Sequence, residues 1–230
     1  MANIITVTLK SWYYMAENVF YYLFYKKRVD KKIKQYLNRK YKKDDVVVVA
    51  IHGVFEYYWQ SYPKYMKYFE KKGKCIIPIQ YNFFDHQKKS MENIKKQIED
   101  IHKKTKAKIV ILGDSDGGFV GAMYMLEKKP NFVKEFIPLT MYYQMPRGVA
   151  FWWVFIKVTP DKFMNYYFNR FKKEKIPTMK INLCAKYDAF ILPARVGVSH
   201  TAKNFTFDTG HFGMLYDMEV IRFVYKHIFG

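Results

Sequence analysis

Cysteine is scarce in this chain of 230 residues, which contains only Cys75 and Cys184. Two cysteines cannot build a disulfide framework. Each lies in a strand-like apolar run, and several strands would separate the two in the sheet inferred below. A bridge between them is therefore geometrically barred, and two buried free thiols fit a reducing compartment.

Acidic residues are also few, because 20 Asp and Glu stand against 40 Lys and Arg, which gives a net charge of +20. Such a surface attracts polyanions, and anionic lipid headgroups and nucleic acid both qualify. No zinc-finger, ribonucleoprotein or helix-turn-helix pattern is present, so nucleic acid is the disfavoured partner. A lysine-rich surface that only maintains solubility is the alternative.

Several other patterns are missing. The chain has no basic segment ahead of an apolar stretch and cleavage site, so we expect no secretory signal and an intracellular location. Metal-ligand spacings and a dinucleotide fingerprint are absent, so we expect no metal and no cofactor. Half of the residues are apolar and a fifth are aromatic, which excludes general disorder and predicts a domain with a sizeable core.

The segment 108–128 (KIVILGDSDGGFVGAMYMLEK) contains the most informative pattern. A buried strand at 109–112 precedes G-D-S-D-G, and a helix is expected from residue 119 to 128. In this context G-x-S-x-G is typical of a nucleophile elbow, with Ser115 exposed on a strained turn. Gly113 and Gly117 would remove the collisions that side chains cause at such a turn. An ordinary strand-to-helix turn with a capping serine is the alternative.

Strands and helices alternate along the rest of the chain. Strands are expected at 46–51, 74–79, 109–112, 132–137, 179–184 and 204–207, and helices at 57–71, 88–105, 119–128 and 218–228. This alternation predicts an α/β fold with a mostly parallel sheet and helices on both faces.

The alternation fails between residues 140 and 173, where the sequence is rich in aromatic residues. This insertion is expected to form an apolar cap over a pocket. A crossover helix packed on the sheet is the alternative. Trp152 and Trp153 in the insertion, and Phe55 after the strand 46–51, are the candidate substrate-binding residues.

The first 45 residues differ from the catalytic domain expected at 46–230. A short strand is expected within 1–9, followed by an aromatic amphipathic helix over 11–25 and a basic segment over 26–43. The helical stretch is too short and too polar for a membrane span. It is either an interfacial anchor on an anionic membrane surface or a helix packed on the domain.

Two further residues complete a reactive constellation with Ser115. A serine needs a base to take its proton, and an imidazole needs a buried acid to fix its tautomer. Asp188 follows the strand 179–184, and His211 follows the last strand, so nucleophile, acid and base occur in the order Ser, Asp, His.

Competing residues fit this order less well. His86 precedes the nucleophile in the chain, His102 and His227 lie in helices, and His200 precedes a strand, while His52 is expected to orient the loop after the strand 46–51. Asp208 is too near His211 in sequence, and Asp161 falls in the expected cap. The backbone amides of Asp116 and Val54 are the expected oxyanion hole. The carboxylate of Asp116 must then point away from the developing charge.

Four segments, VVVVAIHGVF, GDSDGG, KYDAFILP and GHFGMLY, resemble the α/β-hydrolase superfamily, small lipase/esterase type, over residues 46–229. The resemblance implies Ser115 as nucleophile, Asp188 as acid, His211 as base, and the amides of Val54 and Asp116 as oxyanion hole. The chain departs from that family in carrying aspartate on both sides of the serine. Its first 45 residues match nothing in the family pattern.

The expected function is that of a serine hydrolase (lipase or esterase) that cleaves acyl esters through an acyl-serine intermediate, on lipid substrates at a membrane surface. A thioesterase or serine peptidase would use the same residues, since the triad specifies acyl transfer and not the leaving group. A catalytically inert lipid-binding or partner-binding protein is the third alternative. Nothing in the sequence fixes an oligomeric state.

Overall fold

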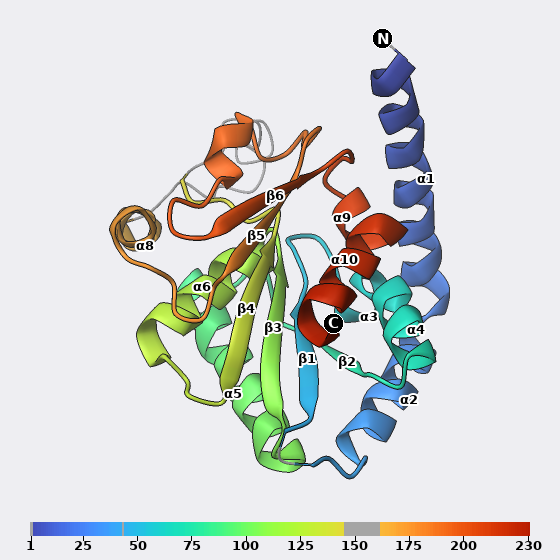
Figure 1. Cartoon of the computed structure of the whole chain (residues 1–230), viewed down its shortest axis with the longest axis vertical. Coiled ribbons are helices and arrows are strands. Elements are labelled where there is room, and N and C mark those ends of the chain that lie inside the picture. Colours follow the sequence, from blue (N-terminus) through green and yellow to red (C-terminus); the bar gives the residue numbers. More distant parts are fainter. Residues whose placement is uncertain (1, 43, 145–161) are drawn as a thin grey trace.

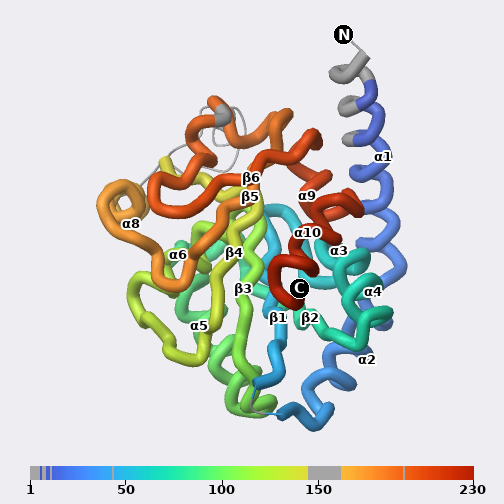
Figure 2. Tube along the Cα trace, viewed as in Figure 1, coloured from blue at the N-terminus to red at the C-terminus, as the bar shows by residue number. Residues whose placement is uncertain are grey.

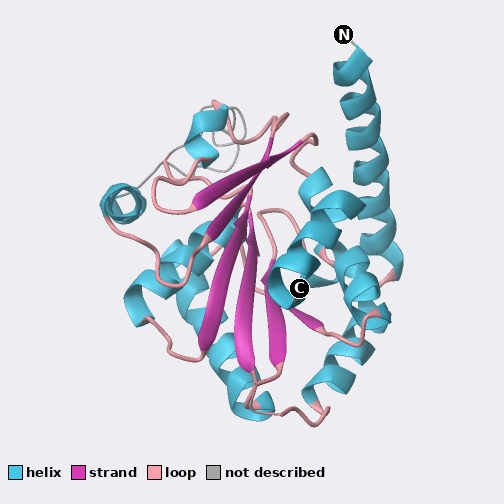
Figure 3. Ribbon diagram, in the orientation of Figure 1, coloured by secondary structure: helices cyan, strands magenta, loops and turns pink. Residues whose placement is uncertain are grey.

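A computed structural model describes residues 2–42, 44–144 and 162–230. Its centre is a six-stranded sheet in the order β2-β1-β3-β4-β5-β6, and every neighbouring pair is parallel (Figures 1 and 3). The strands are β1 (Val46–Ile51), β2 (Ile76–Ile79), β3 (Lys108–Asp114), β4 (Val133–Leu139), β5 (Ile181–Ala185) and β6 (Lys203–Phe207). The predicted parallel α/β architecture is confirmed.

Helices cover both faces of the sheet. On one face lie α5 (Gln87–Thr105) and α6 (Asp116–Lys128), and on the other lie α4 (Pro63–Lys71), α9 (Gly213–Tyr216) and α10 (Met218–Phe229) (Figure 1). Strand β1 is apolar along its whole length and β3 is apolar from Ile109 to Leu112, as expected of strands that helices bury on both sides. Their carboxyl ends lie together at one edge of the sheet, which positions the loops described below.

The helix predicted over 57–71 is divided into α3 (Tyr58–Ser61) and α4, with Tyr62 between them. The cause is Pro63, which lacks an N–H group and disfavours helical backbone in the residue before it. At the elbow, α6 begins at Asp116, three residues before the predicted start.

The strand expected within residues 1–9 is wrong, because α1 is one helix from Ala2 to Phe24. An isolated strand here would leave its backbone groups without a partner, whereas a helix pairs them internally. Helix α2 (Lys26–Leu37) follows and packs beside α3, α5 and the edge strand β2. No helix within the described ranges combines the length and the apolarity that crossing a membrane requires.

The aromatic insertion lies between β4 and β5. Its second half is α8 (Lys162–Lys173), which places Phe168 and Phe171 against Phe119 of α6, each at 5.4 Å between ring centroids. This helix therefore packs like a crossover helix. Residues 145–161, with Trp152 and Trp153, lie outside the described residues, so the cap stays a prediction.

The two cysteines are free, as predicted. Cys75 immediately precedes β2 and Cys184 lies in β5. The sheet order places β1, β3 and β4 between these two strands.

Candidate active site

The chain reverses its direction across the sheet at β1. It leaves β1 for β2 on one side and returns to β3 on the other, so the carboxyl ends of β1 and β3 form a topological switch point. Ligands of open parallel sheets bind in the crevice at such points. The segment 52–56 follows β1 and Ser115 follows β3, so both lie at this crevice.

Ser115 occupies a strained turn between β3 and α6. Its backbone has φ 50° and ψ −117°, a conformation that a residue with a side chain rarely adopts. The surrounding structure holds it there, since a Cβ on Gly117 would lie 2.3 Å from the carbonyl oxygen of His52. A Cβ on Gly113 would lie 2.8 Å from Cα of Gly118. Strand and helix approach so closely that only glycine fits, which is the steric requirement predicted from the sequence.

His211 and Asp188 form a direct pair. The Nδ1 atom of His211 lies 2.7 Å from Oδ2 of Asp188. The backbone N–H groups of Phe190 and Ile191 donate to the other carboxylate oxygen of Asp188, both at 2.8 Å. Burial alone would raise the pKa of Asp188, but the charge and hydrogen bond of His211 and the two N–H groups outweigh it and lower that pKa. An ionised carboxylate thus fixes the orientation of the imidazole through Nδ1. The other ring nitrogen, Nε2, is not engaged by Asp188.

Two more carboxylates, Glu56 and Asp114, lie in this region, and neither was among the predicted site residues. Both side chains are buried. Glu56 accepts hydrogen bonds from the backbone N–H of Gly53 at 3.2 Å and from the hydroxyl of Ser61 at 2.8 Å. Asp114 accepts one from the hydroxyl of Thr140 at 3.2 Å. Burial raises the pKa of each carboxyl group, and for Asp114 the neighbouring charge of Glu56 raises it further.

The pKa of His211 reflects all three acids. Burial acts to lower it, but Asp188, Asp114 and Glu56 raise it to about 9. The sequence contains a signal for Asp114, since it adjoins the serine. Glu56 lies near His211 because the loop after β1 turns back on itself. No sequence spacing predicts that turn.

The loop after β1 passes directly against the elbow. A Cβ on Gly53 would lie 3.2 Å from Cβ of Ser115. His52 anchors this loop, because its Nδ1 lies 2.8 Å from the carbonyl oxygen of Gly53 and its Nε2 accepts from the N–H of Tyr81. Burial lowers the pKa of His52 to about 4, so the ring is neutral and structural. Val54 and Phe55 follow at the partly exposed tip of the loop.

The side chain of Asp116 points away from the elbow. Its two carboxylate oxygens accept hydrogen bonds from the hydroxyls of Tyr81 and Tyr142, each at 2.7 Å. Burial raises the pKa of Asp116, although both tyrosine hydrogen bonds act to lower it. Both carboxylate oxygens are thus engaged by tyrosine hydroxyls, which is compatible with the expectation that the backbone amide of Asp116 contributes to an oxyanion hole.

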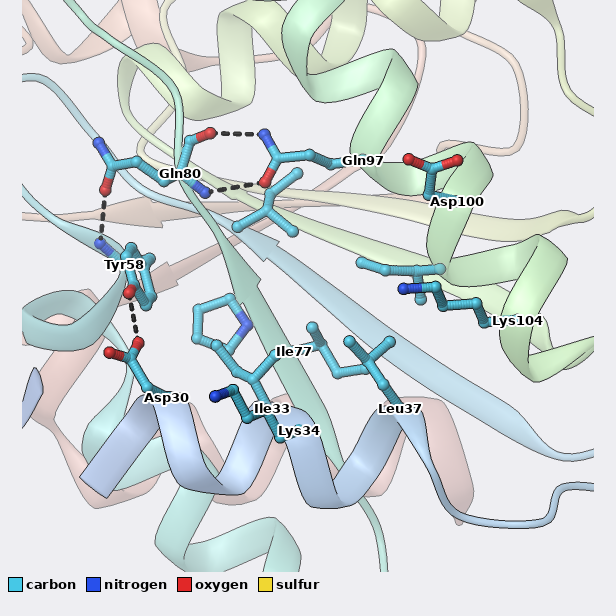
Figure 4. A pocket seen from close by; sticks show the side chains of 13 residues that line it. Asp30, Ile33, Lys34, Leu37, Tyr58, Ile77, Gln80, Gln97, Asp100 and Lys104 are labelled. Atoms are coloured by element: carbon cyan, nitrogen blue, oxygen red, sulfur yellow. Dashed lines mark hydrogen bonds between the residues drawn. The ribbon is translucent and has the colours of Figure 1, made fainter. Parts of the chain in front are cut away.

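A separate groove of about 480 Å³ lies between α2, β2 and α5, and none of Ser115, Asp188 and His211 lines it (Figure 4). Gln97 of α5 occupies the edge of β2 beside it: its amide N–H group donates to the carbonyl oxygen of Gln80, and its amide oxygen accepts from the N–H of Gln80. Tyr58 donates to Asp30 of α2 at the other end. The first two contacts attach α5 to the end of the edge strand, and the third attaches α2 to α3, which supports a structural role for the groove.

No protein-family profile matches this sequence, and no curated protein matches it. Solved structures do match, and they define the class: the chain has the fold of the α/β-hydrolase superfamily, and lipases, esterases and a prolyl endopeptidase are among the structures to which it is similar.

A lipase from Bacillus licheniformis superposes with a TM-score of 0.63 at 12% identity, over 83% of this chain and 94% of that chain. An esterase from Exiguobacterium antarcticum gives 0.57 at 15% identity, over 81% and 93%. An extracellular α/β-hydrolase from a Paenibacillus species gives 0.58 at 11% identity, over 79% and 98%. The superpositions establish the fold. At identities this low they do not establish the substrate or the mechanism, which have to be inferred from the residues of the site.

Proposed function

We propose that the protein is a serine hydrolase that cleaves carboxylic esters through an acyl-enzyme on Ser115. The observation that carries the proposal is the 2.7 Å pair of His211 with a buried, ionised Asp188, at the sheet edge where Ser115 occupies its strained turn. A base oriented by an acid, beside a serine whose hydroxyl a strained backbone presents, is the arrangement that acyl transfer requires.

In the first half of the reaction, Nε2 of His211 takes the proton from Oγ of Ser115 as that oxygen attacks the acyl carbon. The backbone N–H groups of Val54 and Asp116 bind the oxyanion of the tetrahedral intermediate. The ester bond then breaks, and the leaving alcohol takes the proton from His211. Asp188 keeps the imidazole in one orientation and stabilises its charged form throughout.

In the second half, His211 removes a proton from water, and the resulting hydroxide attacks the acyl-Ser115 carbon. The bond to Oγ breaks, the proton returns to Ser115, and the carboxylic acid leaves. Phe55, at the tip of the loop that carries Val54, is a candidate for contact with the acyl chain, as are Trp152 and Trp153 of the insertion.

The test is hydrolysis of p-nitrophenyl esters by the full chain and by two serine variants. Ser115→Ala removes the nucleophile, so we expect kcat to fall by a factor on the order of 10³ or more. Ser90→Ala, a buried serine on α5 that donates to the carbonyl of Asn82, should retain the wild-type rate. Equal turnover by Ser115→Ala and the wild type would exclude the mechanism.

A fluorophosphonate probe separates an enzyme from an inert fold. Labelling of Ser115 in the native protein, lost on denaturation, is expected for an activated serine. Acyl-CoA and peptide substrates assayed in parallel test the leaving group. Faster turnover of either than of the ester would replace the esterase with a thioesterase or a peptidase.

A further inference from the structure

Between Trp12 and Phe24, helix α1 packs on the domain through one side. Tyr14 and Asn18 are buried, and Tyr14 and Tyr21 stack on the ring of Tyr216 at 6.2 and 6.1 Å between centroids. The exposed positions of this stretch are apolar. The exposed large apolar residues of α1 are Leu9, Trp12, Tyr13, Met15, Val19, Phe20, Tyr22, Leu23 and Phe24.

This outer face is unusual for a protein surface in water. Between Trp12 and Phe24 the exposed positions include no charged residue, and the side chains of Trp12 and Phe24 are 65% and 66% exposed. Apolar residues scattered singly are normal on a surface, but a contiguous patch marks a site of interaction.

The face continues toward the candidate active site as a chain of aromatic rings, here called the aromatic ridge: Tyr22, Tyr57, Phe83, Phe84 and Phe55. Successive ring centroids lie 5.6 Å apart for Tyr22 and Tyr57, 6.4 Å for Tyr57 and Phe83, and 5.3 Å for Phe83 and Phe55. Phe84 packs on Phe83 at 4.5 Å and is 68% exposed. The ridge thus ends in the loop that borders Ser115.

The position of α1 fits this continuity. Its N-terminal half projects past the carboxyl edge of the sheet, the edge at which the candidate active site lies (Figures 1 and 2). A flat surface that touched the projecting helix and the ridge would therefore also face the site.

Charge indicates what that surface is. Directly after α1, helix α2 exposes Lys26, Lys27, Arg28, Lys31 and Lys34, and its one acid, Asp30, is engaged by Lys26 and Tyr58. The whole chain carries a net charge of +20. A second copy of the same chain would be repelled at this face, whereas anionic headgroups would be attracted to it.

We propose that the outer face of α1 and the aromatic ridge bind an anionic lipid surface, to which the net positive charge of the chain is attracted. Aromatic and aliphatic side chains would enter the boundary between headgroups and acyl chains, as in interfacial helices. The inference also names the substrate of the proposed hydrolase as lipid in that surface. This second part rests on the proposed function, whereas the binding itself does not.

The test is sedimentation of the full chain with vesicles of phosphatidylcholine, alone or mixed with phosphatidylglycerol. We expect binding to the mixed vesicles that weakens as salt is added. Val19→Glu with Leu23→Glu places two charges on the outer face one helical turn apart, and should lower the partition coefficient at least about tenfold. The matched control, Tyr166→Glu with Val198→Glu, adds the same charge at exposed apolar positions outside α1 and the ridge and should bind like the wild type.

The proposal is overturned if the wild type binds neither vesicle, or if the α1 double variant binds as tightly as the control. A wild-type dimer in sedimentation velocity that the α1 double variant dissociates, without vesicle binding, would assign the face to a second copy instead. Circular dichroism of each variant verifies that it is folded.

The two parts of the inference can fail separately. The α1 double variant should hydrolyse a soluble short-chain ester at the wild-type rate and lose hydrolysis of an ester lipid held in vesicles. Ser115→Ala should bind vesicles like the wild type. Vesicle binding by both proteins, without hydrolysis of any ester by the wild type, would retain the surface and refute the proposed function.

Discussion

His211 is surrounded by more negative charge than a single acid partner would supply. Asp188 binds its Nδ1, while Glu56 and Asp114 lie nearby from the loop after β1 and from the end of β3. Together they raise the pKa of His211 to about 9, against an ordinary value of 6.5. A histidine acts as a base only when it is deprotonated, so the proposed reaction should accelerate as the pH rises toward that value.

This predicts the pH profile of ester hydrolysis. The acid limb of kcat/KM should lie near pH 9. Glu56→Gln should move this limb to lower pH, since it removes a negative charge that stabilises the imidazolium and keeps an oxygen that can accept from Gly53. Glu219→Gln, an exposed acid on α10, is the matched control and should leave the limb unchanged. A limb near pH 6.5 in all three proteins would contradict the assignment.

The free energy of unfolding should decrease over the pH range in which the rate of ester hydrolysis increases. The pKa of His211 is raised in the folded state, so its charged form stabilises the fold fully below pH 6.5, and this contribution is lost as pH rises through about 9. Catalysis and stability therefore favour different ends of the same pH window.

At the residue scale, sequence order identified the pair of Asp188 and His211 because each follows a strand and carries a recognisable chemistry. It could not identify Glu56, which contributes through a backbone turn that brings residue 56 back onto Gly53. The tyrosines that hold Asp116 were equally hidden. Tyr81 and Tyr142 follow different strands, β2 and β4, and only the folded sheet brings both hydroxyls to one carboxylate.

At the element scale, the close approach of α6 to the end of β1 requires that residue 117 is glycine. A Cβ on Gly117 would meet the carbonyl oxygens of His52 and Ile51 at 2.3 and 2.5 Å, and backbone atoms cannot rotate away. Gly117→Ala should therefore lower the free energy of unfolding by about 1–3 kcal/mol or more. It should also abolish ester hydrolysis, because helix and serine move together. Chemical denaturation and the ester assay measure the two effects.

Gly73→Ala is the comparison for that variant. Gly73 has φ 69° with open space around its Cα, so alanine there costs only the backbone strain, roughly 1–2 kcal/mol. Its ester hydrolysis should stay at the wild-type level. Equal losses of activity in the two variants would mean that the close approach at Gly117 does not position the serine.

The elements that the sequence predicted well are those whose pattern is local. Apolar runs defined β1 and β3, and the spacing of apolar residues predicted α5 and α10 to within one residue at each end. The prediction of a strand within residues 1–9 is wrong because it relied on β-branched side chains, which favour a strand. These residues are helical instead, because they continue the helix that follows and because the described structure offers residues 2–10 no neighbouring strand to pair with.

At the scale of the whole molecule, α1 is joined to the α/β domain by a buried polar cycle. Asn18 donates to the hydroxyl of Tyr216 at 2.8 Å, this hydroxyl donates to the backbone oxygen of Gln60 at 2.8 Å, and the amide of Gln60 donates back to Asn18. Tyr216 lies in α9, five residues after His211. The cycle therefore connects the proposed lipid-binding helix with the segment that carries His211.

Asn18→Ala should break this cycle and leave the buried amide of Gln60 without its acceptor, at a cost of about 1–3 kcal/mol in unfolding free energy. Gln35→Ala, at an exposed position of α2, should change stability by less than about 0.5 kcal/mol. Urea denaturation of both variants gives the comparison. Equal stabilities would show that the other contacts of α1, among them the stacking on Tyr216, hold the helix without this cycle. A loss confined to Asn18→Ala would instead mean that helix and domain unfold as one unit, so a membrane contact on α1 would also stabilise the site.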